Sequence, residues 1–360
     1  LGLALSLALS FSLAPFLSPL SGDVHGEAGP LFQLLDVLGY DGEGNHAQGR
    51  RLVFVGDLVD RGPDSVSIVE FVRKIVSAGK AQMVLGNHEM NLLRGERKHG
   101  NHWFWGLPEV IRKDKAAISF QRLADNPIFR DQTLTFFRSL PFALERDDCR
   151  VVHACWDEDA IRQLRDFSQQ NPDGDCMDAF EHFAAKVEAK MAQESVPVDG
   201  EEAHIVRELA WQNGSPVQVV SAGKEGRALK PFFAGGKWRK IERMRWWDTY
   251  TNTTLTVFGH YWRSLPRPLQ TRAAVADFHP TGEDLFDAAS ARCLLGPSKS
   301  ACCIDFSVGV RYEERAKALA PGALGTCLAA LRLPERKLYF SDGIAPCELE
   351  TPNNETPNNA

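Results

Sequence analysis

Short apolar runs that end in glycine or a polar side chain recur along this chain of 360 residues. Continuous apolar runs of this length are typical of β-strands that are covered on both faces. A first strand is predicted at residues 16–21 and a last strand at KLYFSDG (337–343). The runs between them are RLVFVGD (51–57), AQMVLGNHE (81–89), RVVHACW (150–156), LTVFGHYW (255–262) and ACCIDFSVG (301–309).

Helical periodicity lies between the first of these runs. After Pro30, one helical face collects Leu31, Leu34, Leu35 and Leu38. Pro63 and Asp64 form a helix start signal and Gly79 a stop signal, and the apolar face between them holds Val66, Val69, Val72, Ile75 and Val76. The alternation of strands and helices predicts an α/β layered fold. In such sheets functional groups gather beyond the carboxyl ends of the strands.

The rest of the chain is organised around this core. Residues 16–345 are predicted to form one domain, in which the helical, charged stretch 157–250 is an insertion or cap with NPDGDC and AGGKWRK as its loops. Residues 346–360 end in TPNNETPNNA, which predicts a low-complexity tail. The apolar residues 1–15 leave membrane anchoring or export open, although Pro15 and Pro19 interrupt the apolar stretch.

Charge and cysteine content narrow the class of protein. The net charge is −6 and the pI is near 6.0, so no basic surface for duplex nucleic acid or for stable binding to an anionic membrane is expected. The eight cysteines include no CxxC pair, and we interpret them as reduced, mostly buried thiols. We therefore expect a cytoplasmic protein.

Polar side chains follow five of the predicted strands, in GDVHG (22–26), GDLVDRG (56–62), GNHE (86–89), VVHA (151–154) and FGHYW (258–262). A plain turn does not need Asp57, Asp60 and Arg61 together. Any one of these motifs alone is more often structural, but all five lie at the same end of predicted strands. Mixed carboxylate, amide and imidazole ligands suit Mn, Fe or Zn. The sequence thus offers a set of metal ligands: Asp23, His25, Asp57, Asn87, His153 and His260.

This series of motifs resembles the calcineurin-like metallophosphoesterases, the superfamily of Ser/Thr protein phosphatases and diadenosine tetraphosphate hydrolases, and ACCIDFSVGVRY (301–312) resembles bacterial members. The resemblance implies a four-layer α/β/β/α sandwich with a helical insertion. It also implies two divalent metal ions that share a hydroxide for in-line attack on a phosphate ester. One ion would be held by Asp23, His25 and Asp57, and the second by Asp57, Asn87, His153 and His260.

The resemblance also implies roles for three catalytic residues. Arg61 would bind the phosphate oxygens, and His88, oriented by Asp60, would protonate the leaving oxygen. Protein phosphatases of the superfamily present a further arginine, for which the sequence leaves Arg239, Arg243 and Arg245 open.

The substrate also stays open at this point. A phosphoprotein or a phosphomonoester is the main expectation, and a dinucleoside polyphosphate is the alternative. A non-catalytic scaffold would lack metal ligands, which are all present here. The tryptophans near the motifs and in the insertion could stack a nucleobase or fill the core, and the core is favoured: Trp103, Trp105, Trp238, Trp246, Trp247 and Trp262.

Overall fold

The computed structural model describes residues 18–109, 118–194, 199–234, 237–264, 285–287, 289–319 and 324–350. The apolar segment 1–15 and the repeat at 351–360 lie outside these ranges, so the expectations about them stay predictions. Within the described ranges, no helix combines the length and the apolar character that crossing a membrane requires.

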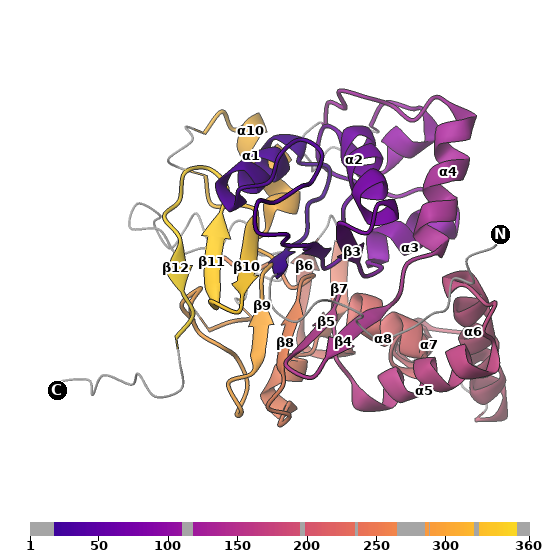
Figure 1. Cartoon of the computed structure of the whole chain (residues 1–360). Helices are drawn as coiled ribbons and strands as arrows, with labels where there is room; N and C mark the ends of the chain where they lie inside the picture. Colours follow the sequence, from indigo (N-terminus) through magenta and orange to yellow (C-terminus); the bar gives the residue numbers. More distant parts are fainter. Residues whose placement is uncertain are drawn as a thin grey trace.

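The first sheet has six strands in the order β12-β11-β10-β1-β2-β3 (Figure 1). Strands β1, β2 and β3 run parallel, and β10 pairs antiparallel with β1. Their bounds are β1 Ser18–Ser21, β2 Leu52–Phe54, β3 Ala81–Met83, β10 Ala329–Leu333, β11 Lys337–Phe340 and β12 Cys347–Glu348.

The second sheet has four strands in the order β4-β5-β8-β9, of which β5, β8 and β9 run parallel. Their bounds are β4 Ala143–Arg146, β5 Cys149–Val152, β8 Leu255–Phe258 and β9 Ala301–Cys303. Apolar side chains of both sheets, such as Val53 and Val257, belong to one buried cluster. The two sheets therefore share a core between them.

Helices lie on the outer sides of the two sheets. Figure 1 shows α1 (Ala28–Leu38) and α2 (Ser65–Ser77) beside the first sheet, and α5 to α8 beside the second. The four leucines predicted for one face of α1 are all buried, and the Asp64 side chain accepts a hydrogen bond from Ser67 N at the start of α2. The predicted mixed α/β fold is thus confirmed, with both early helices on the expected residues.

The remaining described helices complete the molecule. They are α3 Asn87–Leu93, η1 His102–Trp105, α4 Pro127–Arg138, α5 Glu158–Gln170, α6 Cys176–Gln193, α7 Glu201–Gly214, α8 Pro216–Ala222, η2 Trp246–Thr249, η3 Val308–Val310 and α10 Arg311–Ala316. Capping is visible in α5, where Asp157 accepts from Ala160 N, and in α6, where Asp175 accepts from Met177 N and Asp178 N.

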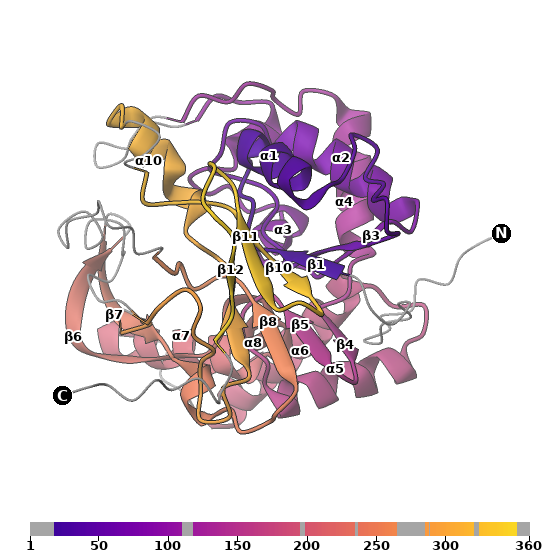
Figure 2. The same ribbon diagram turned by 60° about the vertical axis from the view of Figure 1, so that its left-hand side comes forward.

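One local prediction needs correction. The segment AGGKWRK, predicted to be a loop, belongs largely to a long antiparallel hairpin of β6 (Glu225–Ala234) and β7 (Lys237–Arg243), which projects from the molecule in Figure 2. Trp238 and Ile241 are three positions apart, so the apolar residues of β7 show no period-2 alternation.

The strand predicted at 16–21 is confirmed for the described residues Ser18–Ser21, although it contains Pro19 and lies between β10 and β2. Pairing with β2 begins only at Leu20, so that side of Pro19 needs no N–H donor.

Candidate functional site

All six predicted metal ligands meet where the two sheets end. Asp23 and His25 follow β1, Asp57 follows β2, and Asn87 begins α3 directly after β3. From the second sheet, His153 follows β5 and His260 follows β8. All the ligands except Asn87 are at most 6% exposed. The loops that extend the two sheets therefore bring together side chains that are up to 237 residues apart in the sequence.

The donor atoms converge on one carboxylate oxygen. Asp57 Oδ2 lies 3.3 Å from His153 Nε2 and 3.7 Å from His25 Nε2. His153 Nε2 also lies 3.2 Å from Asn87 Oδ1, and His25 Nε2 lies 3.9 Å from Asp23 Oδ2. The donors of Asp57, His153 and His260 all lie within 4.8 Å of one another. Ligand atoms at about 2.1 Å from one ion are separated by about 3–4 Å, so these spacings fit metal binding on both sides of Asp57.

Hydrogen bonds to the backbone leave the ligand nitrogens free. His25 Nδ1 is paired with the Val59 carbonyl at 3.2 Å and His153 Nδ1 with the Val55 carbonyl at 2.8 Å. This pattern places a proton on each Nδ1 and turns both Nε2 atoms toward Asp57. His25 Nε2 and Asp23 Oδ1 are buried and have no hydrogen-bond partner among the residues that the structure describes. Buried polar atoms are rarely left unpaired, so these residues fit a bound divalent cation.

The charges of the site are strongly coupled. Burial alone raises the pKa of Asp57, but the imidazoles of His153, His88 and His25 outweigh it and hold this pKa well below its usual range. Burial, with Asp305 beside it, raises the pKa of Asp23. Burial also lowers the pKa of His25 and of His260, which keeps both rings neutral, as ligation requires.

His88 and Asp60 form a hydrogen-bonded pair beside the ligands. His88 Nδ1 lies 2.7 Å from Asp60 Oδ2, and Trp103 Nε1 donates to Asp60 Oδ1 at 2.8 Å. Because the indole occupies one carboxylate oxygen, the other orients the His88 ring. His88 Nε2 lies 4.0 Å from Asp57 Oδ2, so His88 also meets the distance criterion for a ligand, together with His25 and Asp57.

Arg61 lies against His88 from the same loop as Asp57. Its Nη2 donates to His88 Nε2 at 3.2 Å, and its backbone N–H donates to the Gly100 carbonyl at 2.8 Å. The φ angles of Asp57, Asp60 and Arg61 are 49°, 75° and 67°, all in the left-handed region. Such non-glycine conformations cost of order 1–3 kcal/mol each and cluster at functional sites. The strained loop turns all three charged side chains toward one place.

Two glycines allow the loops to approach closely. A Cβ atom on Gly259 would lie 1.9 Å from Asp23 Oδ1, and one on Gly86 would lie 2.3 Å from Asp57 Oδ1. A side chain at either position would displace a predicted metal ligand.

Glu89, the last residue of GNHE, has a structural role that the sequence analysis did not assign. Its carboxylate accepts hydrogen bonds from Asp57 N at 2.9 Å, Leu58 N at 2.8 Å and Gly86 N at 3.1 Å. Burial, followed by the neighbouring Asp57, raises the pKa of Glu89 to about 8. Glu89 thus fixes the loop that carries Asp57 against the start of α3.

Replacing Glu89 by glutamine is expected to loosen this loop, because an amide NH₂ would face a backbone N–H donor. One unsatisfied buried donor costs about 1–3 kcal/mol. Urea denaturation above the Glu89 pKa of about 8, where the carboxylate is ionised, should show a loss of unfolding free energy of that size. The matched control is Glu70→Gln. Glu70 is largely exposed, and the hydrogen bonds described for its side chain come from Arg122. Equal stability of Glu89→Gln and the control would contradict this role.

The structure places the three candidates for a further phosphate-binding arginine in different surroundings. Arg243 Nη1 donates to the His260 carbonyl at 2.7 Å, and burial lowers the pKa of Arg243, with a smaller contribution from Arg61. Arg245 instead pairs with Asp287 and Asp248. Arg239 lies farther along β7, paired in register with Phe232. Arg243 alone of the three therefore has a described contact with a predicted ligand residue.

The tryptophans divide between core and site. Trp246 and Trp247 are buried in an aromatic cluster with Phe258, as the core interpretation predicts. Trp103 is fully buried and bonds Asp60, so it supports the site from behind. Trp238 is 69% exposed on the hairpin, and Trp262 lies beside Arg61. Six of the eight cysteines are buried, in agreement with the expectation of mostly buried thiols.

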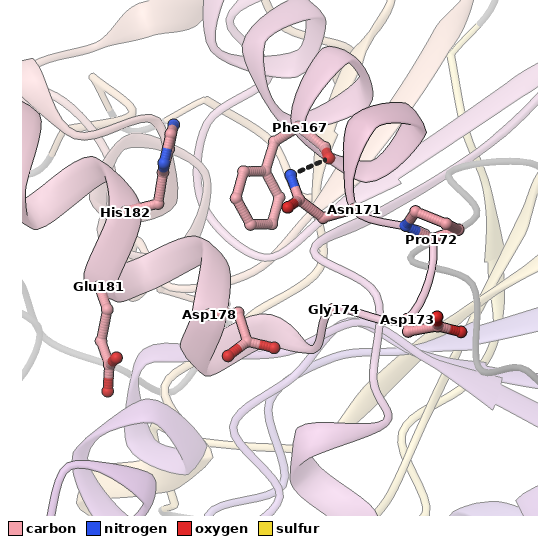
Figure 3. Close-up of a pocket in the computed structure, with 8 residues that line it drawn as sticks. All are labelled: Phe167, Asn171, Pro172, Asp173, Gly174, Asp178, Glu181 and His182. Atoms are coloured by element: carbon pink, nitrogen blue, oxygen red, sulfur yellow. Dashed lines mark hydrogen bonds between the residues drawn. The ribbon is translucent and has the colours of Figure 1, made fainter.

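A pocket of about 590 Å³ lies away from the ligands, between the end of α5 and the start of α6 (Figure 3). Phe167, Asp178 and His182 line it, and the Asn171 side chain donates to the Phe167 carbonyl. None of the predicted site residues lines this pocket.

Comparison with known proteins agrees with this geometry. The sequence model of the calcineurin-like phosphoesterase family matches residues 20–186, which include every predicted site residue except His260. A bis(5'-nucleosyl)-tetraphosphatase PrpE [asymmetrical] of Halalkalibacterium halodurans is 32% identical over 172 residues, covering 42% of this chain and 67% of that protein. The chain belongs to the calcineurin-like phosphoesterase family, whose members are metal-dependent hydrolases.

Other relatives match over shorter regions. A symmetrical bis(5'-nucleosyl)-tetraphosphatase of Vibrio campbellii is 33% identical over 149 residues, covering 39% of this chain and 47% of that protein. Among solved structures, one described as a putative diadenosine tetraphosphatase has a TM-score of 0.43 at 15% identity, with 94% of this chain and 96% of that chain covered.

Proposed function

We propose that this chain hydrolyses phosphate esters with two divalent metal ions, Mn, Fe or Zn, bound on either side of Asp57. The observation that carries the proposal is the position of Asp57 Oδ2, 3.7 Å from His25 Nε2 and 3.3 Å from His153 Nε2. One ion would be held by Asp23, His25 and Asp57, and the other by Asp57, Asn87, His153 and His260. We further infer that the helices and the two sheets form the α/β/β/α sandwich of the family.

Divalent ions held there would supply Lewis-acid stabilisation of a phosphoryl group and a more acidic attacking water. The residues of this chain supply the remaining functions. Arg61 turns its guanidinium from His88 to the phosphoryl oxygens, where its planar fork fits two of them. His88 Nε2 is then open to take up a proton from solvent, and the ring, oriented by Asp60, delivers that proton to the leaving oxygen. The short bond between His88 Nδ1 and Asp60 Oδ2, at 2.7 Å, supports this role.

Arg243 is the further phosphate-binding arginine in this proposal. Its guanidinium is held by the His260 carbonyl, and the charge of Arg61 contributes to its lowered pKa, which places the two cations near each other. Two neighbouring guanidinium groups repel each other until a dianion lies between them. The arrangement therefore favours a terminal phosphoryl group with two negative charges.

The main substrate class is a phosphoprotein or a small phosphomonoester. The second candidate is a dinucleoside polyphosphate, which the names of relatives in both the asymmetrical and the symmetrical classes favour. The two are separated by measuring kcat/KM for a phosphoserine peptide, p-nitrophenyl phosphate and diadenosine tetraphosphate with one metal-loaded preparation. A dinucleoside preference of tenfold or more would establish the second candidate, and a phosphomonoester preference would establish the first.

Metal binding is expected to release protons. Burial lowers the pKa of His153, but the adjacent Asp57 outweighs burial and raises it to about 10 in the metal-free protein. Below this pH the ring is protonated, and it must lose that proton to become a ligand. Apparent Mn²⁺ affinity should therefore rise with pH, by roughly tenfold per unit for each proton displaced. Calorimetry from pH 6 to 8, in buffers of different ionisation enthalpy, measures the proton count; affinity independent of pH would contradict ligation by His153.

A further inference from the structure

Trp262, two residues after the ligand His260, lies against both arginines of the site. The guanidinium carbon of Arg61 lies 4.6 Å from the centroid of the Trp262 ring, and that of Arg243 lies 5.9 Å from it. Both distances are within the range of cation–π attraction. The indole thus lies within cation–π range of both arginines.

The backbone of Trp262 is firmly anchored. Its N–H donates to Asp305 Oδ2 at 2.9 Å, and the next residue, Arg263, donates its N–H to the Asp305 carbonyl at 2.8 Å. Asp305 is 1% exposed, and its other carboxylate oxygen accepts from Ser307 N. The φ angle of Trp262 is 52°, a conformation that the surrounding contacts must enforce. These contacts therefore fix the backbone from which the indole extends.

Part of the Arg61 guanidinium is available for further hydrogen bonds. Its Nη1 is buried without a hydrogen-bond partner in the described part of the chain, whereas Nη2 donates to His88. An arginine with only one side-chain hydrogen bond has little else to fix its rotamer, and the face of Trp262 supplies that restraint.

We propose that Trp262 is a positioning residue that holds the Arg61 guanidinium, and Arg243 beside it, in the orientation that receives the phosphoryl group. This inference rests on the proposed function for its substrate but concerns phosphate affinity, which can be measured without turnover. Losing the indole frees Arg61 to adopt other rotamers, so phosphate binding weakens while the metal ligands stay in place.

The test compares Trp262→Leu and Trp262→Gln, which remove the aromatic face, with Trp262→Phe, which keeps one. Trp238→Leu is the matched control, since Trp238 is 69% exposed on the hairpin. The dissociation constant of inorganic phosphate is measured by calorimetry on metal-loaded protein, with metal content by mass spectrometry. Cation–π attraction of about 0.5–2 kcal/mol corresponds to a weakening of about 2- to 30-fold in the Leu and Gln variants, and a smaller one in Phe.

A second comparison separates positioning from a general structural effect. In the Arg61→Lys background, Trp262→Leu should weaken phosphate binding less than it does in the wild type, because only the longer contact with Arg243 is left unchanged for the indole to restrain. For p-nitrophenyl phosphate, KM should rise with the phosphate dissociation constant while kcat changes less. Loss of metal in the Leu and Gln variants, unchanged phosphate affinity, or additive effects with Arg61→Lys would overturn the inference.

Failure of the proposed function gives a different result. Metal-loaded wild-type protein that binds phosphate but hydrolyses none of the esters would refute the hydrolase, and the phosphate measurements on the variants would still decide the role of Trp262. Wild-type protein that binds metal but no phosphate would overturn this inference directly.

Discussion

Replacing Asp57 by asparagine is expected to abolish turnover and to strip metal from both sides of the site. Asp57 Oδ2 lies 3.7 Å from His25 Nε2 and 3.3 Å from His153 Nε2, between the two proposed ions, and an amide cannot supply a negatively charged bridge between two cations. Loss of a residue that only orients a metal ligand lowers metal affinity or activity roughly 10- to 100-fold. Loss of a ligand that bridges two ions should have a larger effect.

The fold should survive this substitution. Asp57 Oδ1 accepts the His88 N–H at 2.9 Å, and the carbonyl of asparagine can accept the same bond. The matched control is Asp36→Asn on the exposed face of α1, which should change neither activity nor metal content. Metal binding is measured as metal content, turnover as p-nitrophenyl phosphate hydrolysis, and folding by circular dichroism. An Asp57→Asn protein that keeps two metal ions and near wild-type turnover would contradict the bridging role.

Replacing His88 by alanine is expected to lower kcat by roughly 10²–10⁴-fold, the usual contribution of a general acid, with metal content unchanged. The geometry permits two roles for this ring, since His88 Nε2 lies 4.0 Å from Asp57 Oδ2 and 3.2 Å from Arg61 Nη2. The bond from its Nδ1 to Asp60 is the arrangement of an oriented acid. Metal content therefore distinguishes the two roles.

The leaving group provides an independent measurement. An acid matters more when the leaving oxygen is more basic, so the loss in His88→Ala should be greater for an alkyl phosphate than for p-nitrophenyl phosphate. Asp60→Asn should show the same trend with a smaller loss. A loss that is equal for both esters, accompanied by reduced metal content, would identify His88 as a ligand instead.

Much of the fold was predictable because local signals and global structure agree. The leucines of α1 and the Asp64 cap of α2 are local features, and both helices form where these features place them. The apolar runs predicted strands because each is buried from both sides. The projecting β6–β7 hairpin was missed because its two strands pair mainly with each other, so no continuous apolar run marks them.

In the site, too, local motifs were predictable and contacts between distant segments were not. Ligand types and their order are written in compact motifs at strand ends, and the structure brings those residues together. Glu89 and Asp305 were not assigned roles, because each acts by accepting backbone N–H groups from distant loops, and nothing near them in sequence marks those partners. The choice among Arg239, Arg243 and Arg245 also required the structure, because it depends on which of them reaches the loop of His260.

The most direct test of the account is to strip the protein of metal, restore Mn, Zn, Fe or Mg singly, and measure bound ions per chain together with p-nitrophenyl phosphate hydrolysis. We predict two bound ions per chain and activity that appears only as the second ion binds. A folded chain that binds no ion at the Asp57 site, or that hydrolyses the ester equally well after its metal is removed, would contradict the dinuclear mechanism.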